Sequence, residues 1–249
     1  MNEPLYENVF SEEMQKRLIE QYTEIARLAG GLAHEIKNPL STIRLNMELL
    51  AEDLSEAEDS PTNRRALKKI GVVQRECGRL EETLNEFLNF ARAHRLELEP
   101  SDLNEFLTEV LEFYRPKAKE AEIEIVKYFA ADLPTVPLDK NSFRRAFLNL
   151  VINAEQAMPE GGRLVVRTRP AENGVAIDLI DDGRGIDAVT QQRIFEPFFS
   201  TKSGGSGLGL PTVRKVIEAH KGEILLESEQ GFGTQFTIKL PGLVRLPSE

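Results

Sequence analysis

The sequence predicts an α + α/β protein: a helical hairpin that two chains assemble into a four-helix bundle, followed by an α/β sandwich. Three observations predict this organisation. Residues 16–97 carry two long stretches in which apolar residues recur every three or four positions, as on one face of a helix. Residues 98–242 alternate shorter helical and strand-like segments. A turn-rich linker, residues 94–100, lies between them, while residues 1–15 and 243–249 are predicted to be a flexible N-terminus and a C-terminal tail.

The composition is that of an ordinary globular protein. Of 249 residues, 41% are hydrophobic and 29% are charged, which supplies enough apolar residues for packed cores. The formal net charge of −10 argues against nucleic-acid binding. No apolar run is long enough for membrane insertion, and residues 1–10 lack a signal-peptide pattern. We therefore expect a cytoplasmic protein, either whole or the cytoplasmic portion of a larger sensor. The single cysteine, Cys77, is expected to be a packed thiol.

The first helix is predicted over residues 11–54. Its stripe of apolar or small residues consists of Leu18, Tyr22, Ile25, Ala29, Leu32 and Ile36, then Leu40, Ile43, Met47, Leu50 and Leu54. The pattern is heptad-like with a stutter at Pro39, where we expect the helix to bend. His34 lies two residues past Leu32, about 200° around the helix, so it faces away from the stripe. On its own, an ordinary exposed histidine is an equally good interpretation of this position.

A second helix is predicted after a break at residues 59–62, with Ser60 or Thr62 as its N-cap. Its stripe consists of Leu67, Ile70, Val73, Cys77, Leu80, Leu84, Phe87 or Leu88, and Ala91. Two long helices joined by a short polar turn form an antiparallel hairpin. Each stripe is too wide for the hairpin alone to bury, which favours a homodimeric four-helix bundle. The alternative is a monomeric hairpin packed on the following domain.

The second half of the chain is predicted to form a mixed sheet with helices. Helices are expected over residues 103–114, 140–158 and 210–219, the first capped by Ser101-Asp102 and the second by Asp139. Strands are expected over residues 123–128, 163–169, 174–180, 223–227 and 234–240, with a loop at residues 133–137 and a turn at residues 159–162. This order of elements is typical of an α/β sandwich.

Two asparagines in the helix of residues 140–158 are candidate metal ligands. Asn149 and Asn153 are four residues apart and therefore lie on one helix face. Neutral amide oxygens suit Mg²⁺, which normally shares its ligands with phosphates. Two polar residues on a solvated face would also explain this spacing.

An acidic, glycine-rich turn follows one predicted strand at residues 181–185. A carboxylate at the strand end, Asp181, can accept a hydrogen bond from the exocyclic amine of adenine. Gly183 and Gly185 allow the backbone to approach closely and to adopt unusual torsion angles. A surface turn that happens to carry acidic residues is the alternative.

A second glycine-rich stretch, residues 203–210, runs into a predicted helix. Its backbone N–H groups can cradle phosphates ahead of the helix N-terminus. It matches neither the Walker pattern nor the context of the dinucleotide fingerprint. Three phenylalanines in the preceding residues 195–202 suggest a lid with an apolar hinge, or else a loop that fills the core.

Taken together, in this order and spacing, these segments resemble the sensor histidine kinases of two-component signalling over about residues 20–241. The family's phosphoacceptor box is matched by His34-Glu35-Ile36-Lys37-Asn38-Pro39-Leu40, its asparagine box by residues 149–157, its first glycine box by residues 181–185, its phenylalanine box by residues 195–199 and its second glycine box by residues 205–210. Residues 231–236 look like the family's closing segment.

The resemblance implies a Bergerat-type (GHKL) ATP-binding domain, and with it a role for each matching residue. His34 would accept the γ-phosphoryl group of ATP, and Glu35 would fix the histidine tautomer. Asn38 could orient a water molecule that dephosphorylates the response regulator. Asn153 would hold Mg²⁺ with help from Asn149, and Asp181 would select adenine. The other implied nucleotide-binding residues are Gly183, Gly185, Lys202, Gly205, Gly207, Leu208 and Gly209.

The resemblance also implies partners. The chain has no receiver-like segment, so the phosphoryl group would pass to an aspartate of a separate response regulator. The stretch before the first helix is too short for a sensor domain, so we expect input from an upstream sensor or partner. Two other functions are open: an ATP-driven conformational machine without phosphotransfer, and a dimeric adaptor with a degenerate ATP site.

Overall fold

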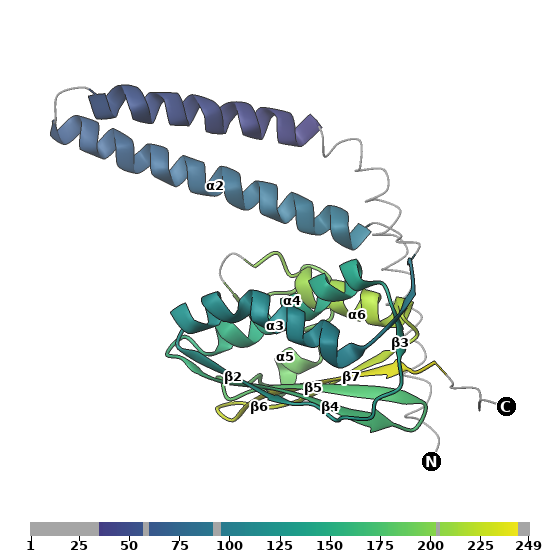
Figure 1. Ribbon diagram of the computed structural model, residues 1–249. Coiled ribbons are helices and arrows are strands. Elements are labelled where there is room, and N and C mark those ends of the chain that lie inside the picture. Colours follow the sequence, from purple (N-terminus) through teal and green to yellow (C-terminus); the bar gives the residue numbers. More distant parts are fainter. Residues whose placement is uncertain (1–34, 57–59, 92–95, 203–204, 244–249) are drawn as a thin grey trace, which may run out of the picture. The chain divides into compact units, whose positions relative to one another are not determined.

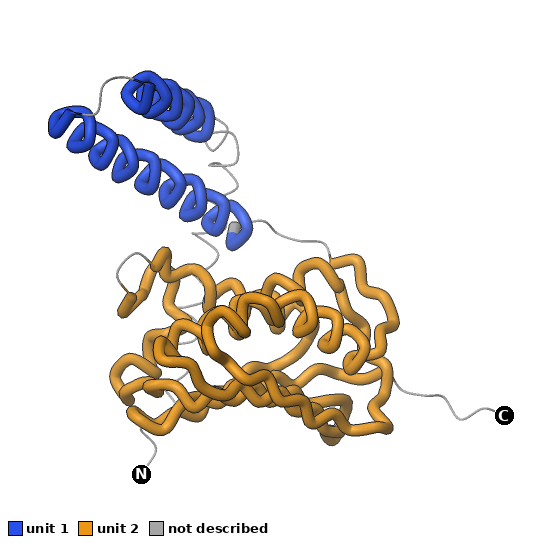
Figure 2. The backbone as a smooth tube through the Cα atoms, turned by 60° about the vertical axis from the view of Figure 1, so that its left-hand side comes forward, with its two compact units in different colours: residues 1–94 blue, residues 95–249 orange. Residues whose placement is uncertain are grey.

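The computed structural model describes residues 35–56, 60–91, 96–202 and 205–243. The chain divides into two compact units, a hairpin unit of residues 1–94 and a C-terminal unit of residues 95–249 (Figure 2). His34 and the first part of the predicted apolar stripe, residues 18–32, lie outside the described residues. None of the helices in the described ranges combines the length and apolar character needed to cross a bilayer.

Two helices lie side by side in the hairpin unit, as predicted. The first covers residues 35–56 and continues through Pro39, and the second is α2 (Pro61–Ala91) (Figure 1). Ser60 caps α2, because its Oγ accepts a hydrogen bond from the Asn63 backbone N–H at 3.1 Å. Of the two predicted caps, the structure therefore selects Ser60.

Each apolar stripe of the hairpin unit is only partly covered. Leu40 on the first helix and Ile70 and Cys77 on α2 are buried, and Cys77 is thus the packed thiol that the sequence predicted. Apolar residues at seven-residue spacing stay exposed on both helices, namely Ile36, Ile43 and Leu50 on the first and Val73 and Leu80 on α2. One half of each stripe therefore closes the hairpin while the other half faces outward.

The C-terminal unit is an α/β sandwich, which confirms the predicted fold class. Its five-stranded sheet has the order β2-β4-β5-β7-β6, in which β2 is parallel to β4 and all other neighbours are antiparallel. The strands are β2 (Ile123–Tyr128), β4 (Gly162–Ala171), β5 (Gly174–Asp181), β6 (Glu223–Glu229) and β7 (Gly233–Pro241). The helices α3 (Leu103–Glu120), α4 (Lys140–Ala157) and α6 (Gly209–Ala219) cover one face of the sheet (Figure 1), and a short α5 (Ala188–Gln191) follows β5.

The core lies between the three longer helices and the sheet. Alternate residues of β5, Val175, Ile177 and Leu179, face the helices and are fully buried. From α4 the largest buried side chains are Phe143 and Phe147. Burial of these residues holds α4 against the sheet, and the site described below depends on this packing.

The structure corrects one part of the sequence prediction. Residues 94–100 were expected to be a linker and residues 133–137 a loop, yet β1 (Glu99–Ser101) pairs with β3 (Val136–Leu138) in a small antiparallel sheet. Proline lies opposite proline in this pair, Pro100 against Pro137, and three-residue strands show no periodicity that a sequence pattern could reveal.

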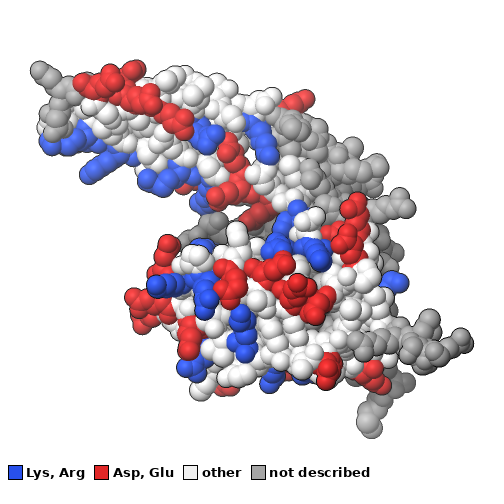
Figure 3. All heavy atoms as spheres, viewed as in Figure 1, with Lys and Arg blue, Asp and Glu red and all other residues white. Residues whose placement is uncertain are grey.

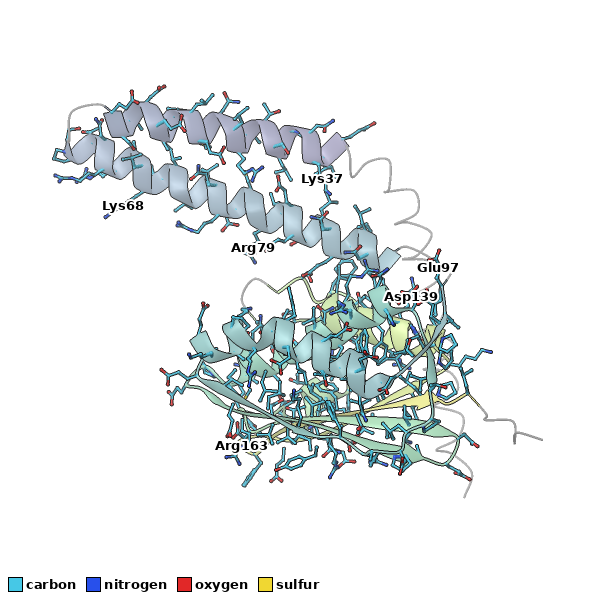
Figure 4. All side chains as sticks on the ribbon, in the orientation of Figure 1. Lys37, Lys68, Arg79, Glu97, Asp139 and Arg163 are labelled. Atoms are coloured by element: carbon cyan, nitrogen blue, oxygen red, sulfur yellow. The ribbon has the colours of Figure 1, made fainter. Side chains whose placement is uncertain are left out.

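Asp139, directly after β3, joins the start of this unit to α4. Its Oδ1 accepts a hydrogen bond from the Ser142 N–H at 2.9 Å and so caps the helix as predicted. Its Oδ2 accepts another from the Glu97 N–H at 3.0 Å, and Glu97 and Asp139 lie close together in Figure 4.

His220, at the end of α6, is buried and makes a hydrogen bond with each ring nitrogen. Its Nε2 accepts from the Asp139 backbone N–H at 3.0 Å, so the ring proton of the neutral tautomer is on Nδ1, which donates to the Val216 carbonyl at 2.7 Å. His220 therefore links the end of α6 to the beginning of α4.

Replacing His220→Leu should lower the free energy of unfolding of the C-terminal unit by about 1–3 kcal/mol, because the partly buried Asp139 N–H loses its acceptor. Urea denaturation followed by circular dichroism measures this change. Glu218→Gln, which removes one end of an exposed ion pair on the same helix, is the control and should change stability by no more than about 0.5 kcal/mol. Equal stabilities of His220→Leu and the control would contradict the structural role of His220.

Candidate functional site

Helix α4 presents a row of side-chain amides beside its buried face. Asn149 and Asn153 are one turn apart and partly exposed, as the four-residue spacing predicted. The buried face of the same helix carries Phe143, Phe147 and Leu150. Because these residues hold α4 in place, they also fix the positions of the two asparagines beside its buried face.

Lys202 reaches α4 from the segment after the phenylalanine box. Its Nζ donates a hydrogen bond to Asn153 Oδ1 at 2.7 Å and another to Gln156 Oε1. Burial lowers the pKa of the Lys202 ammonium to about 8, and the positive charge of Arg184 adds to this effect while Asp181 opposes it. Sequence reasoning predicted Asn153 and Lys202 as site residues but did not predict their direct contact.

Asp181 closes β5 and is nearly inaccessible to solvent, with 4% of its surface exposed. Its Oδ1 accepts a hydrogen bond from the Gly183 N–H at 3.0 Å, and the Thr234 backbone N–H also donates to this carboxyl. Burial nevertheless raises the pKa of Asp181 to about 6. A buried carboxylate at a strand end is poised to accept a hydrogen bond from a ligand.

Two of the predicted glycines are required by the backbone itself. Gly185 has a φ of +65°, and a Cβ there would lie 2.0 Å from the Glu229 carbonyl oxygen. Gly207 has a φ of +70°, and a Cβ there would lie 2.4 Å from the Phe198 carbonyl carbon. Their first role is therefore to let backbone segments of the site pack on one another.

The N-terminus of α6 faces the amide row of α4. A Cβ at Gly209, the first residue of α6, would have Asn149 Nδ2 at 4.0 Å as its nearest neighbour. Leu208 precedes the helix and supplies no side-chain cap, and its own N–H donates to Ser206 Oγ at 3.1 Å. A helix N-terminus opposite neutral amides suits the phosphates of a nucleotide.

The phenylalanine box is tied to the glycine segment. Phe198 donates its backbone N–H to the Gly207 carbonyl at 3.0 Å and has a φ of +65°. Phe195 and Phe199 pack against the core, with Arg193 4.2 Å from the Phe199 ring. Two of the three phenylalanines are thus partly buried against the core, and a movable lid stays a prediction.

The predicted phosphoacceptor residues belong to the hairpin unit. Glu35 and Asn38 lie on the helix of residues 35–56, and both are exposed. His34, which precedes this described helix, lies outside the described residues. The Asn38 backbone carbonyl accepts a hydrogen bond from Thr42 Oγ1 at 3.0 Å, so the helix is continuous just after Asn38.

The assembled groups fit an adenine nucleotide and its metal ion. The described part of the chain contains no cluster of three or more His, Cys, Asp or Glu side chains that could bind a metal alone. A magnesium ion at Asn153 would therefore take its remaining ligands from phosphates and water, as Mg²⁺ usually does. Figure 3 shows acidic and basic side chains interspersed on the visible face of the C-terminal unit.

Sequence reasoning missed two residues of the site. Gln156 follows Asn153 by three residues, so helical periodicity alone would have placed it on the same face. Thr234 lies opposite Asp181 in the β5–β7 pair, and no local pattern indicates this register.

Two family models match this chain. Residues 24–95 match the His Kinase A (phospho-acceptor) domain, and residues 138–243 match the histidine kinase-, DNA gyrase B- and HSP90-like ATPase family. Both matches contain the motifs that the sequence analysis singled out.

Known proteins resemble the chain over most of its length. The sensor histidine kinase ZraS of Escherichia coli is 34% identical over 94% of this chain, which covers 48% of ZraS. Full-length ShkA in complex with AMPPNP superposes with a TM-score of 0.71 at 28% identity, covering 88% of this chain and 46% of ShkA. The catalytic domain of the histidine kinase ThkA is 30% identical with a TM-score of 0.55, covering 59% of this chain and 97% of that domain.

ThkA has also been solved in complex with the response regulator protein TrrA, with a TM-score of 0.65 at 26% identity over 95% of this chain and 67% of that chain. The chain spans about half the length of ZraS. The two matched domains follow one another in the order phosphoacceptor hairpin, then ATP-binding domain. The chain therefore belongs to the histidine kinases, with a phosphoacceptor domain followed by a GHKL ATP-binding domain.

Proposed function

We propose that this chain phosphorylates its own His34 with ATP and passes the phosphoryl group to an aspartate of a separate response regulator. The observation that carries the proposal is the arrangement around α4: a buried carboxylate, a row of amides and the N-terminus of α6 lie in one unit, in a chain whose other unit carries the phosphoacceptor sequence. The complexes of ShkA with AMPPNP and of ThkA with TrrA support the two halves of this proposal.

Asp181 is proposed to recognise the adenine base. Its ionised carboxylate accepts a hydrogen bond from the 6-amino group of adenine, whereas guanine carries a carbonyl oxygen at that position and would be repelled. Two backbone N–H groups, from Gly183 and Thr234, already orient the carboxyl. The base is thus selected by a group whose position is fixed before the nucleotide binds.

The phosphates are proposed to lie between α4 and the N-terminus of α6. Leu208 precedes α6 and Gly209 begins it, and the N-terminal N–H groups of a helix favour anions bound there. Gly205 and Gly207 shape the backbone ahead of the helix, and Lys202 contributes a positive charge. Bound with ATP, Mg²⁺ would neutralise charge on the phosphates, with Asn153 and Asn149 on α4 as its neutral ligands.

His34 and Glu35 are proposed to carry out the transfer. A ring nitrogen of neutral His34 forms a bond to the γ-phosphorus as the bond between that phosphorus and the bridging oxygen of ADP breaks. Glu35 accepts a hydrogen bond from the other ring N–H and so stabilises the positive charge that develops on the imidazole. The regulator's aspartate oxygen then attacks phosphorus, the P–N bond breaks, and His34 is regenerated.

Asn38 is proposed to support the reverse task of dephosphorylating the regulator. It is one helical turn beyond His34, and its exposed side chain belongs to a continuous helix. An amide there can orient a water molecule toward the phosphoaspartate once the regulator has docked beside His34.

The hairpin unit is proposed to form a homodimeric four-helix bundle. Its exposed apolar residues recur at seven-residue spacing on both helices, which is the pattern that buries apolar side chains between paired helices. A second copy of the hairpin would cover Ile43 and Leu50 from the first helix and Leu80 from α2. An upstream sensor helix or input partner could act through the N-terminal end of this bundle.

The labelling test uses γ-labelled ATP and Mg²⁺ with the parent chain and with His34→Ala. We expect label in the parent that survives alkali and is lost in acid, and no label in His34→Ala, because a phosphoramidate is acid-labile and alkali-stable. Phosphate release without labelling of the parent would favour an ATPase without phosphotransfer. Label that persists in His34→Ala would move the acceptor to another residue.

Asp181→Asn should abolish adenine recognition and at the same time stabilise the fold. The folded-state pKa of about 6 lies above the ordinary value of 3.8, so the carboxyl favours folding when it is protonated and this contribution is lost as the pH rises through 6. At pH 7 the charged, buried group costs stability, and Asn removes a cost on the order of 1–3 kcal/mol. We expect a higher unfolding midpoint at pH 7, a smaller gain at pH 4, and loss of the thermal shift that Mg·ATP produces in the parent.

The same pKa predicts that ATP binding by the parent weakens as the pH falls through 6, because the protonated carboxyl is a poorer acceptor for the adenine amine. Calorimetric titrations at pH 5 and pH 7.5 measure this difference, and Glu172→Gln, which removes an exposed carboxyl elsewhere in the C-terminal unit, is the control. If Asp181→Asn binds ATP as tightly as the parent does, Asp181 is not the adenine contact.

Leu80→Asp should break the dimer, because it places a charge in the apolar seam of each chain. The loss of apolar burial should raise the dimer dissociation constant by at least about tenfold, as measured by sedimentation equilibrium. Asn85→Asp adds the same charge at another exposed position of α2 and should leave the association unchanged. Equal dissociation constants for the two variants would argue against this dimer surface.

A further inference from the structure

Asn153 and Gln156 turn two amide oxygens toward a single cation. They lie three residues apart on α4, and both accept a hydrogen bond from Lys202 Nζ, with Asn153 Oδ1 at 2.7 Å. Lys202 comes from a different part of the chain, 49 residues beyond Asn153. The two amides therefore form a small site for a positive charge, which we call the cation seat.

The chemistry of the cation seat is suited to more than an ammonium group. Neutral amide oxygens are also ligands for Mg²⁺, which prefers hard oxygen donors and keeps other positions for phosphates and water. In the part of the chain that the structure describes, no cluster of acidic side chains, histidines or cysteines competes for such an ion. The ammonium of Lys202 thus stands where a divalent ion with two protein oxygens would be held.

The position of Lys202 also fits the nucleotide site as a whole. Its charge interacts with that of Asp181, the proposed adenine contact, so the ammonium is within electrostatic range of both ends of the site. One cation seat cannot hold Lys202 and a divalent ion at the same time, because both would use the same oxygen of Asn153. Binding of the metal with its nucleotide therefore requires the ammonium to leave.

We propose that Gln156 is a second protein ligand of the metal site and that Lys202 fills this site until the metal–nucleotide complex displaces it. The inference rests on the proposed nucleotide site. It adds Gln156 to that site as a ligand, and it adds a competition between Lys202 and the metal ion. Gln156 acts by supplying an oxygen to whichever cation is present.

The test measures binding of AMPPNP by calorimetry, once with saturating Mg²⁺ and once with EDTA, so that no phosphotransfer takes place. The readout is the ratio of the two affinities, in which any effect on nucleotide binding common to both conditions cancels. In a Lys202→Met background, where no ammonium occupies the cation seat, Gln156→Leu should lower this ratio by about fivefold or more, the value of one lost ligand or hydrogen bond. Lys202→Met should raise the ratio, because the metal no longer competes with an ammonium.

Asn141→Leu is the matched control, since it removes an exposed amide from the first turn of the same helix, far from the cation seat. It should leave the ratio of affinities unchanged. If adding Gln156→Leu to Lys202→Met leaves the ratio unchanged, the role of Gln156 is overturned. A Lys202→Met ratio at or below that of the parent would overturn the competition.

The same experiment separates this inference from the proposed function. If the parent does not bind AMPPNP under either condition, the proposed nucleotide site is wrong. If the parent binds AMPPNP and the ratio responds only to Asn153→Leu, the nucleotide site stands and the inference about Gln156 and Lys202 fails. Circular dichroism spectra of all variants confirm that each chain is folded.

Discussion

The C-terminal unit depends on the burial of one face of α4 against the sheet. Phe143, Phe147 and Leu150 are fully buried, and the helical repeat then leaves Asn149, Asn153 and Gln156 on the neighbouring face. A rotation of α4 by a single residue, about 100°, would carry this amide row around the helix toward the core and expose part of the buried face. Hydrophobic packing, which has no chemical specificity of its own, therefore sets the direction in which the polar side chains of α4 point. The backbone of the first glycine box is docked on the end of the same helix, where the Arg184 N–H donates to the Ala157 carbonyl at 3.1 Å.

Two ionisable groups of the site are held in environments that disfavour their charges. Burial raises the pKa of Asp181 and lowers that of Lys202, so both groups reduce stability near neutral pH. Phe198 adds a backbone conformation with φ of +65° that a non-glycine residue rarely adopts. Disfavoured charges and strained backbone that lie close together are expected at a functional site. A ligand with complementary groups offsets their cost in stability when it binds.

The hairpin unit and the C-terminal unit differ in how far they bury their apolar residues. The C-terminal unit encloses its own core between three helices and a sheet, whereas each helix of the hairpin leaves half of its apolar stripe exposed. The stripes of both helices were visible in the sequence, and so was their excess width. The short pair β1–β3 was not, because its three-residue strands carry prolines and are too short to show an apolar periodicity.

The sequence by itself determined the fold class, the helices that bear the motifs and the residue types of the site. Periodicity and capping are local, so the patterns around Ser60, Asp102 and Asp139 predicted where helices begin. Contacts between distant segments were decided only by the tertiary structure: Lys202 on Asn153 and Gln156, Thr234 beside Asp181, and His220 behind Asp139. The physical reason is that such contacts depend on how elements pack and pair across the core. Neighbouring residues in the sequence do not reveal this packing, so the contacts could not be predicted although every residue involved is present in the sequence.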